Sequence, residues 1–208
     1  MIEKQVAQAL LDVKAVMLSP TEPYTWASGL KSPIYCDNRL TMSYPDVRNM
    51  IAKAFAQKIK ELCPEVDYIV GTATAGIPQA CWVANELNLP MAYVRPEPKA
   101  HGRSQQIEGF IPEGSKVILI EDLISTGGSS IKAVQALNNA NIEVMAVFAV
   151  FTYELEKALI NFKQSGTALV CLSNYSTLIE VAKETNVINE TELAILESWR
   201  ESPETFGI

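Results

Sequence analysis

Two adjacent carboxylates, Glu121 and Asp122, follow a run of apolar residues near the middle of the chain. A loop of hydroxyl-bearing residues and glycines comes next, at 125–129, and a helical pattern follows it. Small residues let main-chain N–H groups turn inward around an anion, and the start of a helix adds partial positive charge. We therefore predict that the loop binds a phosphate monoester. The two acids repel phosphate and suit sugar hydroxyls, a Mg²⁺ shell or a cationic centre.

An ordinary strand, turn and helix with two solvated acids is the alternative interpretation. Two acids on an apolar strand, followed by a loop of hydroxyl and glycine residues, argue against it. The segment has neither the Gly-Lys-Ser/Thr ending of a Walker loop nor a G-x-G-x-x-G fingerprint. The pattern therefore favours a phosphate site that belongs to neither of these nucleotide-binding classes.

Three further segments, which connect predicted strands and helices, have residue types that could take part in binding or catalysis. Residues 71–78 connect a strand pattern to a helix pattern through Gly, Ala and Thr. Residues 95–109 are cationic and rich in Pro and Gly, which predicts a mobile surface lid that brings positive charge to a leaving group and excludes water. Residues 24–39 read as a loop with a buried Trp26. Each segment taken alone is also compatible with a plain connection or a solvated loop.

Residues 117–130 closely resemble the 5-phosphoribosyl 1-diphosphate (PRPP) signature of the type I phosphoribosyltransferases. The resemblance implies that the two acids hold the ribose hydroxyls and that the loop holds the 5′-phosphate. Residues 71–78 resemble the pyrophosphate loop of the same family, whose main-chain amides contact the diphosphate. The PRPP-binding residues implied here are Glu121, Asp122, Leu123, Ile124, Ser125, Thr126, Gly127, Gly128, Ser129, Thr72 and Ala73.

The lid and the N-terminal loop narrow the resemblance to the orotate phosphoribosyltransferases. The lid has the order Arg95-x-x-x-Lys99-x-His101-Gly, and residues 28–33 read Ser-Gly-Leu-Lys-Ser-Pro, as in the hood over the base. The resemblance, which covers most of residues 20–155, implies catalytic roles for Arg95, Lys99, His101 and Asp122. The three lid residues would also bind PRPP, and Ser125 and Lys31 would bind orotate.

The resemblance further implies a reaction, a cofactor and an assembly. PRPP and orotate would give orotidine 5′-monophosphate and diphosphate, in pyrimidine (UMP) biosynthesis. Mg²⁺ would be held mainly by PRPP and water rather than by protein ligands. The enzyme would be a homodimer in which Arg95, Lys99 and His101 act in the other subunit's site. Two alternatives stay open here: a purine-base enzyme of the same superfamily, and a PRPP-sensing regulator without catalysis.

Three positions depart from the orotate enzymes. Ala27 stands where many members have Lys, and Tyr153 stands near a position where many relatives have an Arg that contacts the orotate carboxylate. Pro96 replaces a second Lys of the lid. The groups that meet the orotate carboxylate are therefore an open question at this stage.

The elements that position these segments alternate between apolar strands and helices. Continuous apolar strands predict a parallel sheet covered on both faces, an α/β fold in which ligands bind beyond the carboxyl ends of the strands. We expect one domain over residues 1–208, with a hood from about 1–40, and the type I phosphoribosyltransferase fold with its mostly parallel sheet. The expected helices are 3–17, 45–63, 77–88, 128–140 and 190–200, the expected strands are 68–70, 91–94, 116–120 and 144–151, and residues 18–32 are expected to be a loop.

Composition limits the possible partners. The 208 residues carry a net charge of −7, which argues against nucleic acid or an anionic membrane surface, because both attract basic proteins. No apolar run approaches a membrane span, and the N-terminus does not read as a signal peptide. The four cysteines are scattered without a C-x-x-C pair, which fits a reducing cytoplasm.

Overall fold

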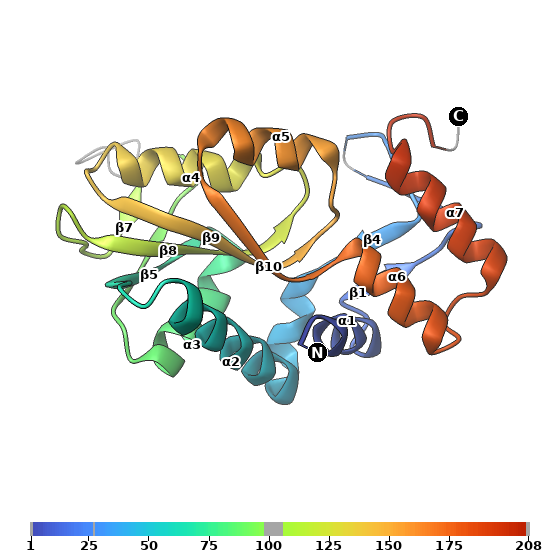
Figure 1. The fold of residues 1–208 in the computed structure, drawn as a ribbon, viewed down its shortest axis with the longest axis horizontal. Coiled ribbons are helices and arrows are strands. Elements are labelled where there is room, and N and C mark those ends of the chain that lie inside the picture. The colour runs from blue at the N-terminus through green and yellow to red at the C-terminus, as the bar shows by residue number, and fades with distance from the viewer. Residues whose placement is uncertain (1, 27, 98–105, 207–208) are drawn as a thin grey trace.

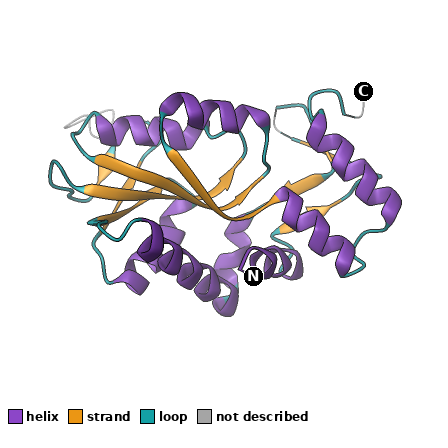
Figure 2. Ribbon diagram, in the orientation of Figure 1, coloured by secondary structure: helices purple, strands orange, loops and turns teal. Residues whose placement is uncertain are grey.

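The computed structural model describes residues 2–26, 28–97 and 106–206, and these form a central sheet between layers of helices (Figures 1 and 2). The sheet has six strands in the order β10-β9-β8-β5-β6-β7. Neighbouring strands are parallel except for β7, which is antiparallel to β6 at one edge. The strands are β5 (Tyr68–Thr72), β6 (Met91–Val94), β7 (Ile107–Glu108), β8 (Lys116–Ile124), β9 (Glu143–Thr152) and β10 (Ala168–Asn174).

Helices cover both faces of this sheet, as the continuous apolar strands predict (Figure 2). In β8, Ile118 and Ile120 belong to a buried cluster with Phe55 of α2. Val117 and Leu119, which point to the opposite face, belong to a second cluster with α4 and α5. The helices that flank the sheet are α2 (Pro45–Leu62), α3 (Gly76–Leu87), α4 (Gly128–Asn138) and α5 (Glu156–Ser165).

The N-terminal and C-terminal segments form the other end of the molecule (Figure 1). Two short antiparallel pairs, β1 with β4 and β2 with β3, are followed by a 3-10 helix, η1. Trp26 of this hood stacks near Tyr153 and Trp199, with ring centroids 5.0 and 5.8 Å away. The elements here are α1 (Ile2–Asp12), β1 (Val16–Leu18), β2 (Tyr24–Thr25), β3 (Lys31–Ser32), β4 (Ile34–Cys36), η1 (Asn38–Ser43), α6 (Tyr175–Glu184) and α7 (Glu190–Glu201).

Two expectations for the N-terminal region are wrong. The helix expected over 3–17 ends at Asp12, and the loop expected over 18–32 contains β2 and β3. Lys14 adopts a positive φ of 56° that stops the helix, and β1 then pairs with β4 in the register Val16↔Cys36. The apolar residues at 13, 16 and 17 fit a helical spacing, but residues 16 and 17 form a strand because β4, up to twenty residues further along the chain, supplies the hydrogen bonds.

The remaining expected elements are confirmed with shifted ends. Helix 77–88 begins one residue earlier, at Gly76, and helix 128–140 ends at Asn138. The strand expected over 116–120 continues to Ile124, because β9 pairs alongside it as far as Ile124↔Thr152. Within the described residues, no helix is long and apolar enough to cross a membrane.

Candidate active site

Three of the segments that the sequence indicates as functional meet at the carboxyl ends of neighbouring strands of the sheet. Strands β5, β6 and β8 are parallel neighbours, so their carboxyl ends lie side by side. The segments that follow them line a cavity of about 350 Å³. Its walls include Thr72, Ala73, Arg95, Gly128 and Ser129 from the sequence-predicted set.

The loop after β8 is shaped by a glycine in the left-handed region. Gly127 has φ +77° and caps α4, and a Cβ at this position would lie 2.6 Å from the ring of Phe162. The Nδ2 of Asn161 in α5 donates to the carbonyl oxygen of Thr126 at 2.9 Å. This hydrogen bond joins the turn to a neighbouring helix. Gly128 and Ser129 then occupy the exposed first turn of α4. The first N–H groups of a helix have no partner within it, so this turn presents donors to an anion.

The side chain of Glu121 is hydrogen-bonded to two serines of the same helix. The side chain is 5% exposed, and its Oε2 accepts hydrogen bonds from Ser130 Oγ at 3.0 Å and Ser129 Oγ at 3.5 Å. Burial, followed by the negative charge of Asp122, raises the pKa of Glu121 to about 8. Glu121 Oε1 also accepts a hydrogen bond from the main-chain N–H of Asp122 at 3.2 Å. Glu121 therefore keeps its proton near neutral pH.

Burial and the partners of Asp122 have opposite effects on its pKa, and the net effect raises it. Burial raises its pKa, while hydrogen bonds from Glu121 and from main-chain N–H groups, together with the positive charge of Arg39, lower it. Asp122 is also less buried than Glu121. A single negative charge at this position can accept hydrogen bonds from sugar hydroxyls or attract a developing cation.

The 71–78 segment packs against β8 through a glycine. A Cβ on Gly76 would lie 2.5 Å from the carbonyl oxygen of Ile120, so α3 approaches the strand as closely as it does only with glycine there. The peptide bond between Ala73 and Thr74 is cis. The N–H of Ala73 donates to the carbonyl oxygen of Val94 at 2.8 Å and is already occupied. Thr72 Oγ1, in contrast, is buried and has no hydrogen-bond partner among the described residues.

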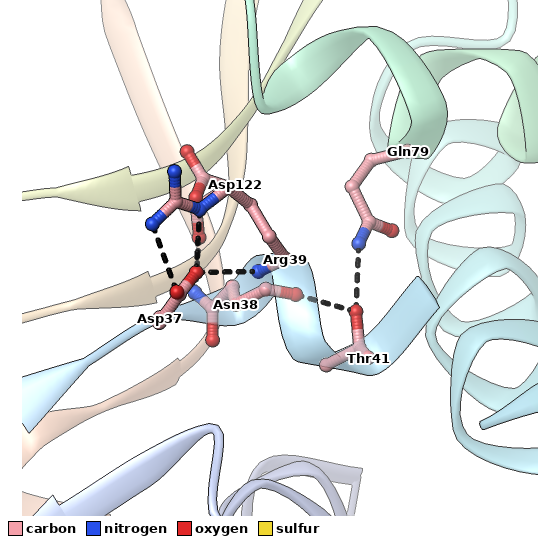
Figure 3. A network of polar contacts seen from close by, with 6 residues as sticks. All are labelled: Asp37, Asn38, Arg39, Thr41, Gln79 and Asp122. Atoms are coloured by element: carbon pink, nitrogen blue, oxygen red, sulfur yellow. Dashed lines mark hydrogen bonds and ion pairs between the residues drawn. The ribbon is translucent and has the colours of Figure 1, made fainter. Parts of the chain in front are cut away.

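A buried polar network connects the hood to the end of β8 that carries the acid pair (Figure 3). The Nδ2 of Asn38 donates to the carbonyl oxygen of Asp122 at 2.6 Å. Thr41 Oγ1 donates to the carbonyl oxygen of Asn38 at 2.7 Å, and Gln79 Nε2 of α3 donates to Thr41 Oγ1 at 3.1 Å. The hood, the acid pair and α3 are thus held together by side chains far apart in sequence.

The sequence-predicted cations occupy different surroundings. Arg95 forms an ion pair with Glu108 of β7 at 3.5 Å. Lys31 donates to Thr25 Oγ1 at 2.8 Å on the exposed β2–β3 pair. Lys99 and His101 lie outside the described residues, as does Ala27. Tyr153 is 4% exposed, and burial raises the pKa of its hydroxyl, so it stays neutral.

Comparison with known proteins identifies the architecture. Residues 43–174 match the phosphoribosyl transferase domain family. The orotate phosphoribosyltransferase of Listeria innocua is 57% identical over 99% of both chains, and that of Enterococcus faecalis is 55% identical over 99% of this chain and 98% of its own. The chain belongs to the orotate phosphoribosyltransferase family. These relatives favour the orotate interpretation over a purine-base enzyme or a PRPP-sensing regulator.

Solved structures agree with this family and its type I phosphoribosyltransferase fold. The orotate phosphoribosyltransferase of Aeropyrum pernix superposes with a TM-score of 0.77 at 26% identity, covering 88% of this chain and 99% of its own. The UMP synthase of Leishmania donovani superposes with a TM-score of 0.82 at 26% identity, covering 97% of this chain and 42% of its own. The mostly parallel sheet and the helices on both faces are therefore those of an orotate phosphoribosyltransferase.

Magnesium is the metal expected beside PRPP in this family. Within the described residues, no group of three or more His, Cys, Asp or Glu side chains is placed to hold a metal ion. Asp122, near the end of β8, offers a carboxylate just before the loop, which fits an ion that keeps several waters and takes its other ligands from phosphates.

Sequence reasoning missed two groups of residues at this orotate phosphoribosyltransferase site. Lys132 lines the cavity beside Ser129. The sequence could have indicated this, because residues three apart on a helix lie on the same face. Asn38 and Gln79 carried no local signal, because what they contact lies 84 and 38 residues away in sequence.

Proposed function

We propose that this orotate phosphoribosyltransferase transfers the 5-phosphoribosyl group of PRPP to orotate, giving orotidine 5′-monophosphate and diphosphate. The observation that carries the proposal is the cavity at the ends of β5, β6 and β8. Gly128 and Ser129 of the phosphate-type loop line it, together with Thr72, whose buried hydroxyl has no partner among the described residues. The acid pair is joined to this wall by the hydrogen bond from Ser129 Oγ to Glu121. This set matches the three parts of PRPP.

Each part of PRPP has a group suited to it. The loop over Ser125–Ser129, with the first turn of α4, would hold the 5′-phosphate, and the last residues of β8, Leu123 and Ile124, lead into it. Asp122 would accept hydrogen bonds from the ribose hydroxyls, with Glu121 buried behind it and held by Ser130 Oγ. Thr72 Oγ1 would donate to the diphosphate in place of the Ala73 N–H, which is occupied.

The difficult step is departure of the diphosphate. Orotate is already an anion at neutral pH, so it needs no strong base to become a nucleophile. Arg95, Lys99 and His101 would neutralise charge on the leaving group, and His101 would give a proton to the leaving oxygen. Bound Mg²⁺ would supply further neutralisation of the phosphates. Asp122 would favour positive charge that develops on the ribose ring.

Orotate would be bound between the hood and the loop. Ser125 is half-buried at the start of the loop and can donate its hydroxyl. Lys31 would supply positive charge from the β2–β3 pair, where its ammonium already contacts Thr25 Oγ1. Binding of the remote 5′-phosphate then orients the ribose toward the base.

The assembly and the location are parts of the same proposal. The enzyme would act as a homodimer whose lid residues enter the partner's site. The chain would form one domain over 1–208, with the hood at one end. Four free cysteines support a reducing cytoplasm, where a pyrimidine-forming enzyme would meet PRPP.

The direct test follows orotate absorbance with purified protein, PRPP and Mg²⁺. We expect absorbance to fall only when all three components are present with the enzyme. A screen of purine bases under the same conditions should give no turnover. A flat trace with orotate, from folded protein that still binds PRPP, would overturn the proposal.

A further inference from the structure

Arg39 is a cation of the hood that no step above uses. It follows Asn38, whose side chain is fully buried and bonded to the main chain of Asp122. Asn38 is in turn held through Thr41 to Gln79 of α3. Loss of any of these buried bonds would leave unsatisfied polar groups, so the position of η1 relative to Asp122 is well determined.

The direction of the Arg39 side chain is also determined. Asp37 accepts hydrogen bonds from Nε at 2.6 Å and Nη2 at 2.8 Å, and its side chain also caps η1 through the Arg39 N–H. A bidentate carboxylate restricts the rotamers of a guanidinium. Nη1 has no hydrogen-bond partner among the described residues, and the side chain of Arg39 is 60% exposed. The guanidinium is therefore oriented in advance and still has donors to offer.

Arg39 extends toward Asp122 rather than away from it (Figure 3). The charges of Arg39 and Asp122 act on each other: Arg39 lowers the pKa of Asp122, and Asp122 raises that of Arg39. The hydrogen bonds of the guanidinium go to Asp37, so this attraction acts across a gap.

The chemistry of orotate requires a cation in this region. Its carboxylate is attached to the ring carbon next to the nitrogen that attacks the ribose. A group that binds this carboxylate must therefore lie close to the anomeric carbon, and so close to the acid that holds the ribose. Arg39 meets this requirement, whereas Lys31 contacts Thr25 on the exposed β2–β3 pair and Tyr153 is buried and neutral.

We propose that Arg39 binds the carboxylate of orotate and makes the enzyme select orotate over uracil-type bases that lack this group. The inference rests on the proposed function, because it assigns a residue to the base that is transferred. Asp37 is then a positioning residue, which holds the guanidinium in the direction that the carboxylate needs.

The test is Arg39→Gln in the full-length enzyme, with orotate varied at saturating PRPP. Loss of a charge-assisted hydrogen bond costs about 1.5–3 kcal/mol, so we expect the KM for orotate to rise roughly 10- to 100-fold. The Kd for PRPP should stay within about twofold in a direct titration. Arg39→Lys should recover part of the loss, because it retains charge without the bidentate geometry.

Two matched variants separate this role from simpler effects. Lys53→Gln removes one positive charge from the exposed face of α2 and should leave the KM for orotate unchanged. Asp37→Asn combined with Arg39→Gln removes the ion pair without leaving Asp37 unpaired, and it should keep the raised KM. A double variant with the wild-type KM would overturn the proposal, since the single variant would then act through an uncompensated Asp37.

A ligand pair gives a readout that needs no turnover. Inhibition by orotate methyl ester, which lacks the carboxylate charge, should be unchanged in Arg39→Gln, while binding of orotate weakens. Equal weakening of both ligands, or weakening of PRPP alone, would overturn the assignment. Turnover of orotate by the wild-type enzyme tests the proposed function separately, so the two failures are distinguishable.

Discussion

The two sides of the proposed site are positioned in different ways. One side, called the strand edge below, lies at the carboxyl ends of β5, β6 and β8, and the other side is the hood. At the strand edge, the acid pair, Gly127 and the first turn of α4 are consecutive in sequence, and their positions follow from one strand, one turn and one helix. In the hood, short strands and a 3-10 helix are held by contacts that span the chain, such as Asn38 with Asp122. The acid pair and the proposed phosphate loop are therefore positioned by local structure, whereas the hood, where the base is proposed to bind, is positioned by tertiary contacts.

The comparison predicts where single substitutions act. A change at the strand edge should affect PRPP and every base equally, whereas a change in the hood should affect orotate first.

The largest effect should come from the lid, which belongs to neither side. Lys99→Ala removes a positive charge from the departing diphosphate, and one such transition-state contact is worth about 10²- to 10³-fold in kcat. Steady-state kinetics with orotate measure it. A loss of less than about threefold would contradict the role of Lys99.

The same variant tests the dimer. Mixing Lys99→Ala with Asp122→Asn should restore activity, because heterodimers then contain one intact site. Absence of restoration, with subunit exchange demonstrated, would mean that the lid acts within its own subunit.

Gly127→Ala should damage the strand edge. The positive φ and the contact with Phe162 together should lower the free energy of unfolding by about 2–4 kcal/mol, and PRPP should bind more weakly. Thermal unfolding and PRPP titration measure both. Gly128→Ala is the matched control, since its Cβ would meet only Thr126 Oγ1 at 3.9 Å. Equal effects of the two substitutions would show that the backbone of Gly127 is not special.

Asn38→Ala should uncouple the hood from the strand edge. It leaves the Asp122 carbonyl oxygen without its donor, which should cost about 1–3 kcal/mol of stability. We expect the KM for orotate to rise more than the Kd for PRPP. A larger effect on PRPP would break the division between the two sides.

A pH dependence of stability at the strand edge is expected in addition to the effects of these substitutions. The pKa of Glu121 is raised from 4.5 to about 8, so the folded protein binds a proton that the unfolded chain releases between these values. This contribution to stability is full below about pH 4.5 and is lost as the pH rises through about 8. Denaturant unfolding across this window should show a falling wild-type contribution that Glu121→Gln lacks. Parallel curves for the two proteins would contradict the assignment.

Elements with one clear periodicity could be predicted from sequence. The strands around Tyr68–Val70, Met91–Val94 and Val117–Ile120 are confirmed, since residues buried on both faces must all be apolar. The region after Asp12 could not be predicted, because short apolar runs fit either a helix or a strand and the pairing partner decides. The contacts of Gln79 and Asn38 could not be predicted for a related reason. Their partners lie far away in sequence, and the neighbouring residues give no indication of them.

The sequence by itself determined the α/β class of this protein and the strand, turn and helix that carry Glu121, Asp122 and Gly127. Each depends on residues that are adjacent in the chain, so type and spacing are sufficient to predict them. Only the tertiary structure decided that the Ala73 N–H is occupied, that Glu121 is the buried, protonated member of its pair, and that Arg39 extends toward Asp122. These properties depend on burial and on partners far away in sequence, and no local pattern encodes them.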